Sequence, residues 1–284
     1  MRLLPILESI YILGDVGYFG RSLTRLIDIF RINVSLNDNR VILLGDNFYP
    51  EGIKEKDDNQ WKLFENAFRD VPYKRINAVM GNHDYMGDPK LQLSSKYFEN
   101  NEFYYKRSFS NFDLFFLDTV PLYSGHCYIS KEIIENVHGE SASILKERQI
   151  KWLTDELQKS TNNGRRKIVF GHYPIVSNGF YFDQVKPLYK TLIPIFEKFR
   201  IDAYISGHEH NIQYIKREIS KDYVFHQFIM GSSSENRQNE VYNPFHIDFF
   251  DNTDTYFLEL YEKDNKLFFN FKNKYNIVKH LFII

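Results

Sequence analysis

The sequence predicts an α/β (α+β) fold in which strands and helices alternate in layers. Short apolar runs of strand length recur along the chain, and each ends in a Gly, Asp or Ser signal. These runs are Ser9–Leu13, Val41–Leu44, Ile76–Met80, Leu114–Leu117, Lys167–Phe170, Ala203–Ser206 and Phe225–Ile229. Between them, apolar residues fall at helical spacing, for example at Leu23, Leu26, Ile27 and Phe30. This alternation is typical of layered α/β domains.

The C-terminal third favours a mixed sheet over a purely parallel one. Tyr256–Tyr261 and Leu267–Phe271 flank the sequence Glu-Lys-Asp-Asn, a pattern typical of an antiparallel hairpin. Ser124–Glu147 shows no clear period, so we expect an excursion over the surface. Neither a linker-like composition nor an internal repeat divides the chain, and we expect a single domain over residues 1–284.

Composition and charge argue against several classes of protein. The 284 residues hold 36 Lys+Arg against 37 Asp+Glu, which gives a formal net charge of −1. With a sequence pI near 6.8, an electrostatically driven nucleic-acid binder is not expected. The 43% hydrophobic and 17% aromatic fractions exclude a disordered chain. No apolar run approaches the roughly 20 residues that a membrane-spanning helix needs.

The number of cysteines and the N-terminal sequence are informative about the cellular compartment of the protein. Cys127 is the single cysteine, so an internal disulfide is excluded. The first residues lack the apolar core and small-residue cleavage site of a secretory signal. The sequence therefore predicts a cytoplasmic protein.

Five predicted strands each end in a Gly that is followed by a potential metal ligand. The segments are Gly14-Asp15-Val16-Gly17, Gly45-Asp46-Asn47-Phe48-Tyr49, Gly81-Asn82-His83-Asp84, Gly171-His172-Tyr173-Pro174 and Gly207-His208-Glu209-His210. Ligands bind at the carboxyl ends of strands in open α/β sheets. Each segment alone would more often be a turn, a cap or a solvated loop. Their ordered combination favours one shared site.

The types of side chain in these segments indicate a metal site. Carboxylate, amide and phenol oxygens together with imidazoles suit iron, manganese or zinc, and no thiolate is present to select a softer metal. Seven or eight such groups are too many for one tetrahedral zinc. They suit two metal ions about 3.5–4 Å apart, an arrangement that catalyses displacement at phosphorus.

The series GDVG, GDNFY, GNHD, GHYP and GHEH resembles the metallophosphoesterase superfamily of calcineurin-like phosphatases. Gly45–Gly52 looks like the purple acid phosphatases, specifically the small tartrate-resistant type, and Phe116–Leu122 and Gly207–Tyr214 are similar to them as well. The resemblance covers roughly residues 9 to 235. It implies a four-layer αββα sandwich of two mixed β-sheets flanked by helices.

One coupled exchange marks the subfamily that this chain resembles. Most members of the superfamily begin with Asp-x-His, in which the His binds the first metal. Here Gly17 stands at that position, and Tyr49 follows Asp46 by three residues. Replacing an imidazole with a phenol keeps the number of ligands and favours iron(III).

The resemblance implies a role for each residue of the motifs. Asp15, Tyr49 and His210 are expected to bind a ferric ion. Asn82, His172 and His208 are expected to bind a second ion, divalent iron, zinc or manganese, and Asp46 is expected to bridge the two. His83 would contact the substrate phosphate and assist the leaving group. Asp84 would orient His83.

The activity implied is direct hydrolysis of a phosphomonoester by metal-activated hydroxide, with no Ser or Cys nucleophile. The expected substrate is a phosphorylated small molecule or a phosphopeptide, and neither a nucleic-acid nor a membrane partner is expected. Two alternatives stay open. One is a phosphodiesterase or protein phosphatase with the same site, and the other is a catalytically silent binding scaffold.

Some segments depart from the family pattern or stay ambiguous. Within Ile175–Asp183, the aromatic residues of Phe180–Phe182 stand where related phosphatases carry acidic or imidazole groups, and Asp183 is the nearest acid, so the substrate is not defined. Ser232–Ser234 would line the pocket rim or form a plain turn. The histidines outside the motifs are expected on the surface or with local partners: His126, His138, His226, His246 and His280.

Overall fold

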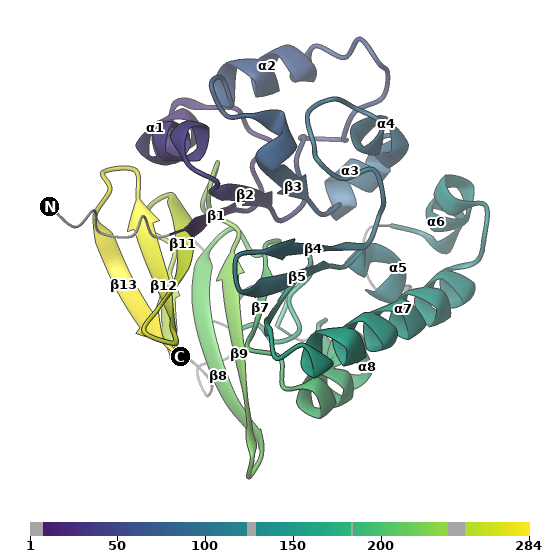
Figure 1. Cartoon of the computed structure of the whole chain (residues 1–284). Coiled ribbons are helices and arrows are strands. Elements are labelled where there is room, and N and C mark those ends of the chain that lie inside the picture. Colours follow the sequence, from purple (N-terminus) through teal and green to yellow (C-terminus); the bar gives the residue numbers. More distant parts are fainter. Residues whose placement is uncertain (1–7, 124–128, 183, 238–247) are drawn as a thin grey trace, which may run out of the picture.

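The first of two sheets carries the N-terminal half of the strand-end motifs. The computed structural model describes residues 8–123, 129–182, 184–237 and 248–284. This sheet has six strands in the order β13-β12-β11-β1-β2-β3 (Figure 1). β1 pairs in parallel with β2 and antiparallel with β11, so the sheet is mixed. The strands are β1 (Ser9–Leu13), β2 (Arg40–Leu43), β3 (Ile76–Ala78), β11 (Tyr256–Lys263), β12 (Lys266–Asn273) and β13 (Val278–Ile283).

The second sheet has seven strands in the order β10-β8-β9-β7-β6-β5-β4. Its centre is parallel, with β6 between β5 and β7, whereas β4 pairs antiparallel with β5 and β8 antiparallel with β9. The strands are β4 (Tyr105–Phe109), β5 (Phe112–Phe116), β6 (Arg166–Phe170), β7 (Ala203–Ser206), β8 (Ile212–Ser220), β9 (Tyr223–Met230) and β10 (Phe249–Asp251).

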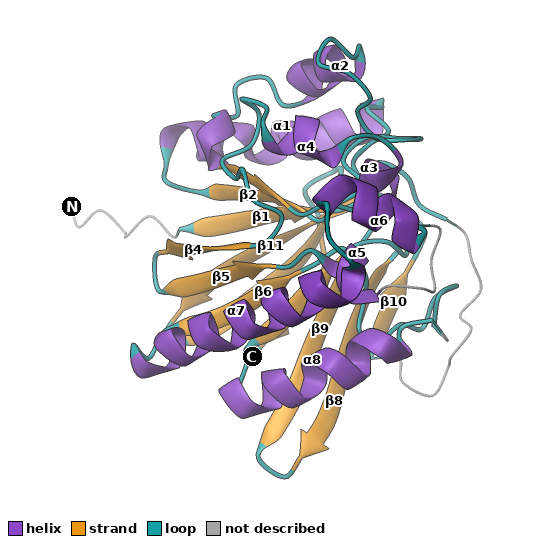
Figure 2. Ribbon diagram, turned by 90° about the vertical axis from the view of Figure 1, so that its right-hand side faces the viewer, coloured by secondary structure: helices purple, strands orange, loops and turns teal. Residues whose placement is uncertain are grey.

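Helices cover the outer faces of both sheets (Figures 1 and 2). Helices α1 to α4 lie beside the six-stranded sheet, and the long helices α7 and α8 lie on the seven-stranded sheet. The helices are α1 (Arg21–Leu36), α2 (Gln60–Ala67), α3 (Asn82–Met86), α4 (Pro89–Leu93), α5 (Thr119–Tyr123), α6 (Lys131–His138), α7 (Ala142–Asn162) and α8 (Lys186–Phe199). A short 3₁₀ helix spans Tyr73–Arg75. The layers confirm the expected αββα sandwich of two mixed sheets.

Alternation along β1 shows how the layers are held together. Ile10 and Ile12 are fully buried between the two sheets, whereas Tyr11 and Leu13 pack under the helices. The Tyr11 ring stacks on Phe30 of α1, with ring centroids 4.6 Å apart. Burial on both faces explains why the strands read as continuous apolar runs.

The predicted strands agree with the observed ones to within a few residues. β7 has the predicted bounds, and β1 does as well. The C-terminal hairpin has a tighter turn than the gap of five residues between its predicted strands, because β11 and β12 pair as far as Lys263 and Lys266. Asp264 and Asn265 form the turn with positive φ angles of 52° and 58°, which match the twist of a hairpin.

The part of Ser124–Glu147 that the structure describes is helical, which its lack of a clear period did not predict. Residues 129–147 contain α6 and the beginning of α7. The Ser130 side chain accepts a hydrogen bond from the backbone N–H of Ile133, and Gly139 ends the helix in the left-handed conformation. Two turns are too short for a clear period, and these caps define α6.

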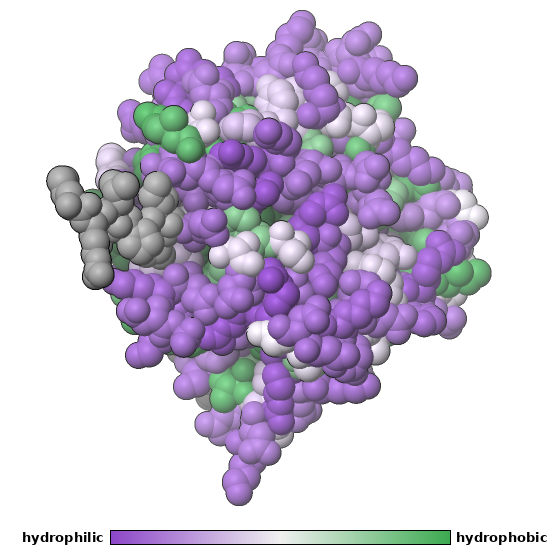
Figure 3. All heavy atoms as spheres, in the orientation of Figure 1, coloured by the Kyte–Doolittle hydropathy of each residue, from purple (hydrophilic) through white to green (hydrophobic). Residues whose placement is uncertain are grey.

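The surface in Figure 3 is mostly hydrophilic, with separate apolar spots. Two exposed apolar residues on α1 are Ile32 and Leu36, at 62% and 77% exposure. Among the described residues, the helices include none with the length and apolarity needed to cross a bilayer.

Candidate metal centre

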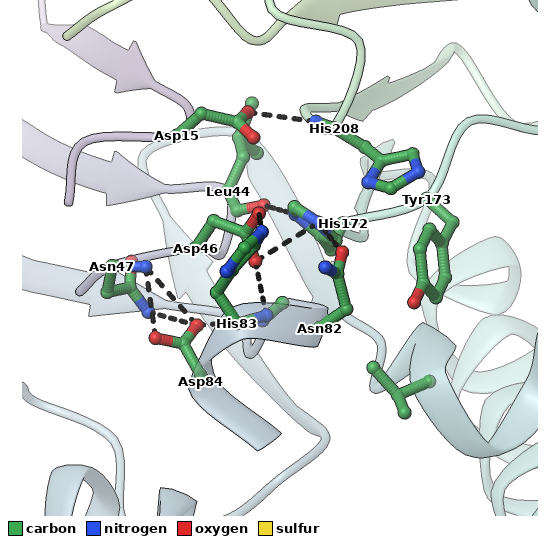
Figure 4. A network of polar contacts seen from close by, with 12 residues as sticks. Asp15, Leu44, Asp46, Asn47, Asn82, His83, Asp84, His172, Tyr173 and His208 are labelled. Carbon is green, nitrogen blue, oxygen red and sulfur yellow. Dashed lines mark hydrogen bonds and ion pairs between the residues drawn. The ribbon is translucent and has the colours of Figure 1, made fainter. Parts of the chain in front are cut away.

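The polar side chains of the five motifs meet where strands of both sheets end (Figure 4). From the six-stranded sheet come Asp15 after β1, Asp46 and Tyr49 after β2, and Asn82 at the beginning of α3. From the seven-stranded sheet come His172 after β6, and His208 and His210 after β7. The structure therefore brings together the seven residues expected to bind metal, all of them buried.

One group of ligands surrounds the Tyr49 phenol. Its hydroxyl lies 3.1 Å from Asp15 Oδ1, 3.0 Å from Asp46 Oδ2 and 2.9 Å from His210 Nε2. His210 Nε2 also lies 3.4 Å from Asp15 Oδ1. Potential ligand atoms of Asp15, Asp46 and His210 all lie within 4.8 Å of one another. This is the set expected for the first metal, together with Asp46.

A second group of ligands surrounds His172. Its Nε2 lies 3.0 Å from Asn82 Oδ1 and 3.4 Å from Asp46 Oδ1. Potential ligand atoms of Asp46, His172 and His208 lie within 4.8 Å of one another. The same carboxylate thus belongs to both groups, with Oδ2 directed to Tyr49 and Oδ1 to His172.

Several atoms of the second group face one another as acceptors, with no hydrogen-bond donor between them in the described part of the chain. A bound cation would satisfy them. His172 Nδ1 lies 2.8 Å from the Leu44 carbonyl oxygen, so Nδ1 carries the proton and donates it. The lone pair of Nε2 then faces two oxygen acceptors, those of Asn82 and Asp46. His208 Nε2 is buried and has no hydrogen-bond partner among the described residues. Such convergent acceptors are costly to bury unless a metal ion joins them.

The backbone of the ligand loops is held in a sparsely populated conformation. Asp15, Asp46, His208 and His210 have positive φ angles of 56°, 51°, 73° and 46°. Non-glycine residues at positive φ are uncommon, and they concentrate at functional sites. At Gly45 (φ 88°), a Cβ would lie 2.7 Å from His172 Nδ1, so the close approach of these loops requires glycine.

Electrostatics also favour metal binding. Burial, and then the negative charges of Asp46 and Asp15, raise the pKa of Tyr49 well above its ordinary value. Phenolate therefore forms only where a cation offsets the two carboxylates. Burial and the neighbouring His172 and His210 lower the pKa of His208 well below its ordinary value. His208 is thus held neutral, the form that binds metals.

His83 lies at the edge of this cluster. Its backbone N–H donates to Asp46 Oδ1 at 2.9 Å, and its Nε2 lies 4.0 Å from Asp46 Oδ2. The Nδ1 atom contacts the carbonyl oxygen of Pro50. The side chain is 30% exposed, so it is open to a substrate that approaches the cluster.

Asp84 points away from the cluster, towards Asn47 (Figure 4). Its carboxylate accepts hydrogen bonds from the backbone N–H groups of Asn47 and Gly81 and from the Gln92 side chain. Among the described residues, the His83 ring is bonded to Pro50 rather than to Asp84. Asp84 thus links the loops after β2 and β3. Its bonds go to Asn47 and Gly81, the neighbours in sequence of Asp46 and Asn82, and not to the His83 ring.

Thr119 is a supporting residue that the sequence analysis missed. Its Oγ1 accepts hydrogen bonds from the backbone N–H groups of His172 and Tyr173, at 3.2 and 3.1 Å. Thr119 lies within Phe116–Leu122, which was singled out only as a similar stretch. A strand end that carries a hydroxyl beside the ligand strands is the signal that could have identified it.

Glu209 is a second supporting residue that was missed. Its Oε1 accepts from the Ser177 hydroxyl and, at 3.1 Å, from the Tyr181 backbone N–H. Burial raises the pKa of Glu209 to about 7. The Tyr181 ring stacks on His208 with centroids 4.2 Å apart. The loop with Phe180–Phe182, which departs from the family pattern, therefore forms a wall of the candidate centre. Asp183 lies outside the described residues.

A buried polar cluster lies behind α3. The Tyr85 hydroxyl donates to Asp118 Oδ2 and lies 2.7 Å from His138 Nε2. The backbone N–H of Asp118 donates to Gln149 Oε1 at 2.9 Å. Burial raises the pKa of Asp118 to about 7, and burial lowers that of His138 to about 4. This cluster ties the helix that carries Asn82 to α5, α6 and α7.

The remaining ambiguous residues have local partners. His138 bonds to Tyr85, His226 Nδ1 lies 2.8 Å from the Tyr214 hydroxyl, and His280 packs on Phe249. His126 and His246 lie outside the described residues. The hydroxyls of Ser233 and Ser234 bond to backbone oxygens of Tyr256 and Asp15, so this segment braces the loop of the first ligand.

Comparison with known proteins agrees with this geometry. The family model described as calcineurin-like phosphoesterase matches residues 9–211. Purple acid phosphatase 17 of Arabidopsis thaliana is 32% identical over 227 residues, which cover 75% of this chain and 65% of that protein. Tartrate-resistant acid phosphatase type 5 of Sus scrofa is 28% identical over 241 residues, with 78% and 68% covered. The chain thus spans about two thirds of the length of these relatives.

A solved structure shares the fold over nearly the whole chain. It is GAP50, described as the anchor in the inner membrane complex of Plasmodium, with a TM-score of 0.75 and 21% sequence identity. The alignment covers 97% of this chain and 87% of GAP50. The resemblance to calcineurin-like and purple acid phosphatases, stated above from the motifs, is confirmed by the family model and the curated relatives.

Proposed function

This chain belongs to the calcineurin-like phosphoesterase family, and from that premise we propose that it is a phosphomonoesterase of purple acid phosphatase type. The observation that carries the proposal is the position of Asp46, whose two carboxylate oxygens face two separate groups of potential ligands. The names of the curated relatives, which are acid phosphatases, support the same activity.

The residues fit two metal ions of different character. Tyr49 would supply a phenolate beside Asp15 and His210, a set that suits iron(III). Asn82, His172 and His208 would supply an amide oxygen and two imidazoles to divalent iron, zinc or manganese. Asp46 would be shared between the two. When bound, such metals lower the pKa of a coordinated water and polarise the oxygens of a phosphoryl group.

The protein contributes positioning and a proton. The Pro50 carbonyl holds the His83 ring through Nδ1, which leaves Nε2 directed at the edge of the ligand cluster. An imidazolium there can donate a proton from Nε2 to the departing alkoxide. The bond from the His83 backbone N–H to Asp46 fixes the distance between this proton donor and the bridging carboxylate. We assign Asp84 a positioning role through Asn47 and Gly81.

The substrate class proposed is a phosphorylated small molecule or a phosphopeptide. A phosphodiesterase or protein phosphatase would use the same ligands, and the walls of the site would distinguish the two. Activity on an aryl monoester, a bis-aryl diester and a phosphopeptide separates these alternatives.

The test is hydrolysis of p-nitrophenyl phosphate as a function of pH after reconstitution with iron plus zinc or manganese. Asp46→Asn weakens both metal sites, so we expect activity to collapse together with the content of bound metal. Asp222→Asn, in the exposed turn between β8 and β9, is the matched control and should behave like wild type. Metal content is measured on the same samples by mass spectrometry.

Three results would lead to different conclusions. Activity that is lost only in Asp46→Asn supports the proposal. Two bound metals without monoesterase activity would overturn it in favour of the diesterase alternative. Absence of both metal and activity would favour a catalytically silent binding scaffold.

A further inference from the structure

A cation stands beside the candidate metal centre. Arg237 follows β9, and its backbone N–H donates to the carbonyl oxygen of His210 at 2.8 Å. Its Nη1 lies 3.5 Å from the hydroxyl of Tyr181. The Tyr181 ring in turn stacks on His208. Arg237 is therefore tied to both ligands that follow β7, through its backbone to one and through Tyr181 to the other.

The guanidinium is close enough to influence the ligands electrostatically. After burial and the neighbouring His172 and His210, its charge also lowers the pKa of His208. Burial acts to lower the pKa of Arg237, but the contact with Tyr181, and then Tyr49 and Asp15, raise it above its ordinary value. These effects act across the centre, since Tyr49 and Asp15 belong to the six-stranded sheet and Arg237 to the other. His83, on α3, approaches the same ligands from the six-stranded side.

Among the described residues, Arg237 forms no ion pair with a carboxylate, and its side chain is exposed. Its contact with Tyr181 is to a neutral hydroxyl. A cation so placed attracts an anion that approaches the ligand cluster. One phosphoryl group can be held by the metal ligands and His83, so the guanidinium remains available for another negative charge.

We propose that Arg237 and the Tyr181 hydroxyl form an anion subsite that binds a second negatively charged group of the substrate, separate from the scissile phosphate. The inference rests on the proposed function. The planar guanidinium favours a carboxylate, which it can bind through two parallel hydrogen bonds. The preferred substrates would then be phosphomonoesters whose alcohol part carries a carboxylate.

The first test is equilibrium binding, which requires no turnover. Benzylphosphonate and (4-carboxybenzyl)phosphonate differ only in the carboxylate and are not hydrolysed. We expect the metal-loaded wild type to bind the carboxylated compound about tenfold more tightly or better, as for a charge-assisted hydrogen bond, when measured by calorimetry. Arg237→Ala should abolish that preference and leave the affinity for benzylphosphonate within about twofold.

Two further variants test the chemistry of the subsite. Arg237→Lys keeps the charge but not the paired donors, so part of the preference should return. Lys221→Ala, in the exposed β8–β9 turn, is the matched control and should keep the full preference. In kinetics, Arg237→Ala should raise KM for 4-carboxyphenyl phosphate about tenfold and leave kcat for phenyl phosphate unchanged.

The outcomes distinguish this inference from the proposed function. If the wild type hydrolyses phenyl phosphate but shows no preference between the two phosphonates, the subsite is overturned and the phosphatase activity stands. Equal losses for both compounds in Arg237→Ala would overturn it as well, because the guanidinium would then act on the phosphate itself or on folding. If the wild type binds with the preference yet hydrolyses neither aryl phosphate, the subsite is supported and the proposed reaction fails.

Discussion

The ring of Tyr49 occupies the space that a side chain at Gly17 would need. A Cβ at Gly17 would lie 2.5 Å from the backbone nitrogen of Tyr49 and 2.7 Å from its ring Cδ2. The resembled superfamily usually has a His at this position, and here the phenol is present instead. With this course of the Phe48–Tyr49 backbone, a side chain at position 17 is excluded, and the Tyr49 ring lies against the Gly17 backbone.

Gly17→Ala is expected to displace Tyr49 from Asp15 and His210. Because small displacements in an active site cost as much as about 100-fold in rate, we expect phosphatase activity to fall by roughly that factor. The visible absorption of an iron(III)–phenolate pair should be lost in parallel. Gly20→Ala is the matched control, since a Cβ there meets nothing within 4 Å. An unchanged spectrum in Gly17→Ala would show that Tyr49 does not bind iron.

Asn82→Ala removes the amide oxygen that faces His172 Nε2. The first group of ligands is left intact, so we expect the metal content to fall from about two ions per chain to about one, with iron retained. The measurement is elemental analysis after dialysis against a weak chelator. Asn101→Ala, at an exposed position, should keep both ions. Loss of both ions in Asn82→Ala would contradict two separable sites.

Asp118→Asn tests the buried cluster of Tyr85, Asp118 and His138. Burial raises the pKa of Asp118 from 3.8 to about 7 in the folded protein. The folded state therefore holds its proton more tightly than the unfolded state, and the wild type loses stability as pH rises from about 4 to about 7. Asn does not titrate. The difference between the unfolding free energies of wild type and variant (wild type minus variant) should fall by up to about 4 kcal/mol between pH 4 and 7.

Urea denaturation of the metal-free proteins at several pH values measures this difference. Asp222→Asn should show no such dependence relative to wild type, because its side chain is exposed. A difference between wild type and Asp118→Asn that stays constant from pH 4 to 7 would mean that Asp118 is ionised throughout.

Asp84→Ala leaves several buried donors without an acceptor, those of Asn47, Gly81 and Gln92. Each unsatisfied buried group costs about 1–3 kcal/mol, so the variant should lose at least about 2 kcal/mol of stability. Activity should fall at all pH values without a shift of the pH profile. A shifted profile would instead mean that Asp84 acts on the protonation of His83. Asp57→Ala, at an exposed position, is the control.

The sequence predicted which polar side chains meet at the strand ends more fully than it predicted the elements around them. Asp15, Asp46 and His172 directly follow glycines at strand ends, a local signal that is independent of the rest of the chain. The short helix α6 and the edge strand β13 were missed. Two turns of helix have too few apolar positions for a period, and β13 is largely exposed, so its residues lack the burial that gives other strands an apolar run.

The supporting residues could not be found in the same way. The Thr119 hydroxyl contacts the backbone N–H of His172, 53 residues away in sequence. The backbone N–H of Arg237 contacts the carbonyl oxygen of His210, 27 residues away. Every residue has backbone groups, so hydrogen bonds to them leave no pair of residue types to find in the sequence. Only the hydroxyl of Thr119 at a strand end gives a local signal. The hydrogen-bond partners of Asp84 could not be predicted for a related reason, since its acceptor role toward backbone N–H groups leaves no pattern.

Ligands from both sheets converge at one edge of the sandwich, and this has a mechanical consequence. Asp15, Asp46 and Asn82 belong to one sheet, whereas His172, His208 and His210 belong to the other. Metal ions bound by residues of both sheets would link the two sheets at that edge and oppose their separation. Loading would then lengthen the lifetime of the folded chain as well as activate it. Amide protons at the ends of β1, β2 and β7 should exchange faster after the metals are removed, while those at the opposite edge should change little.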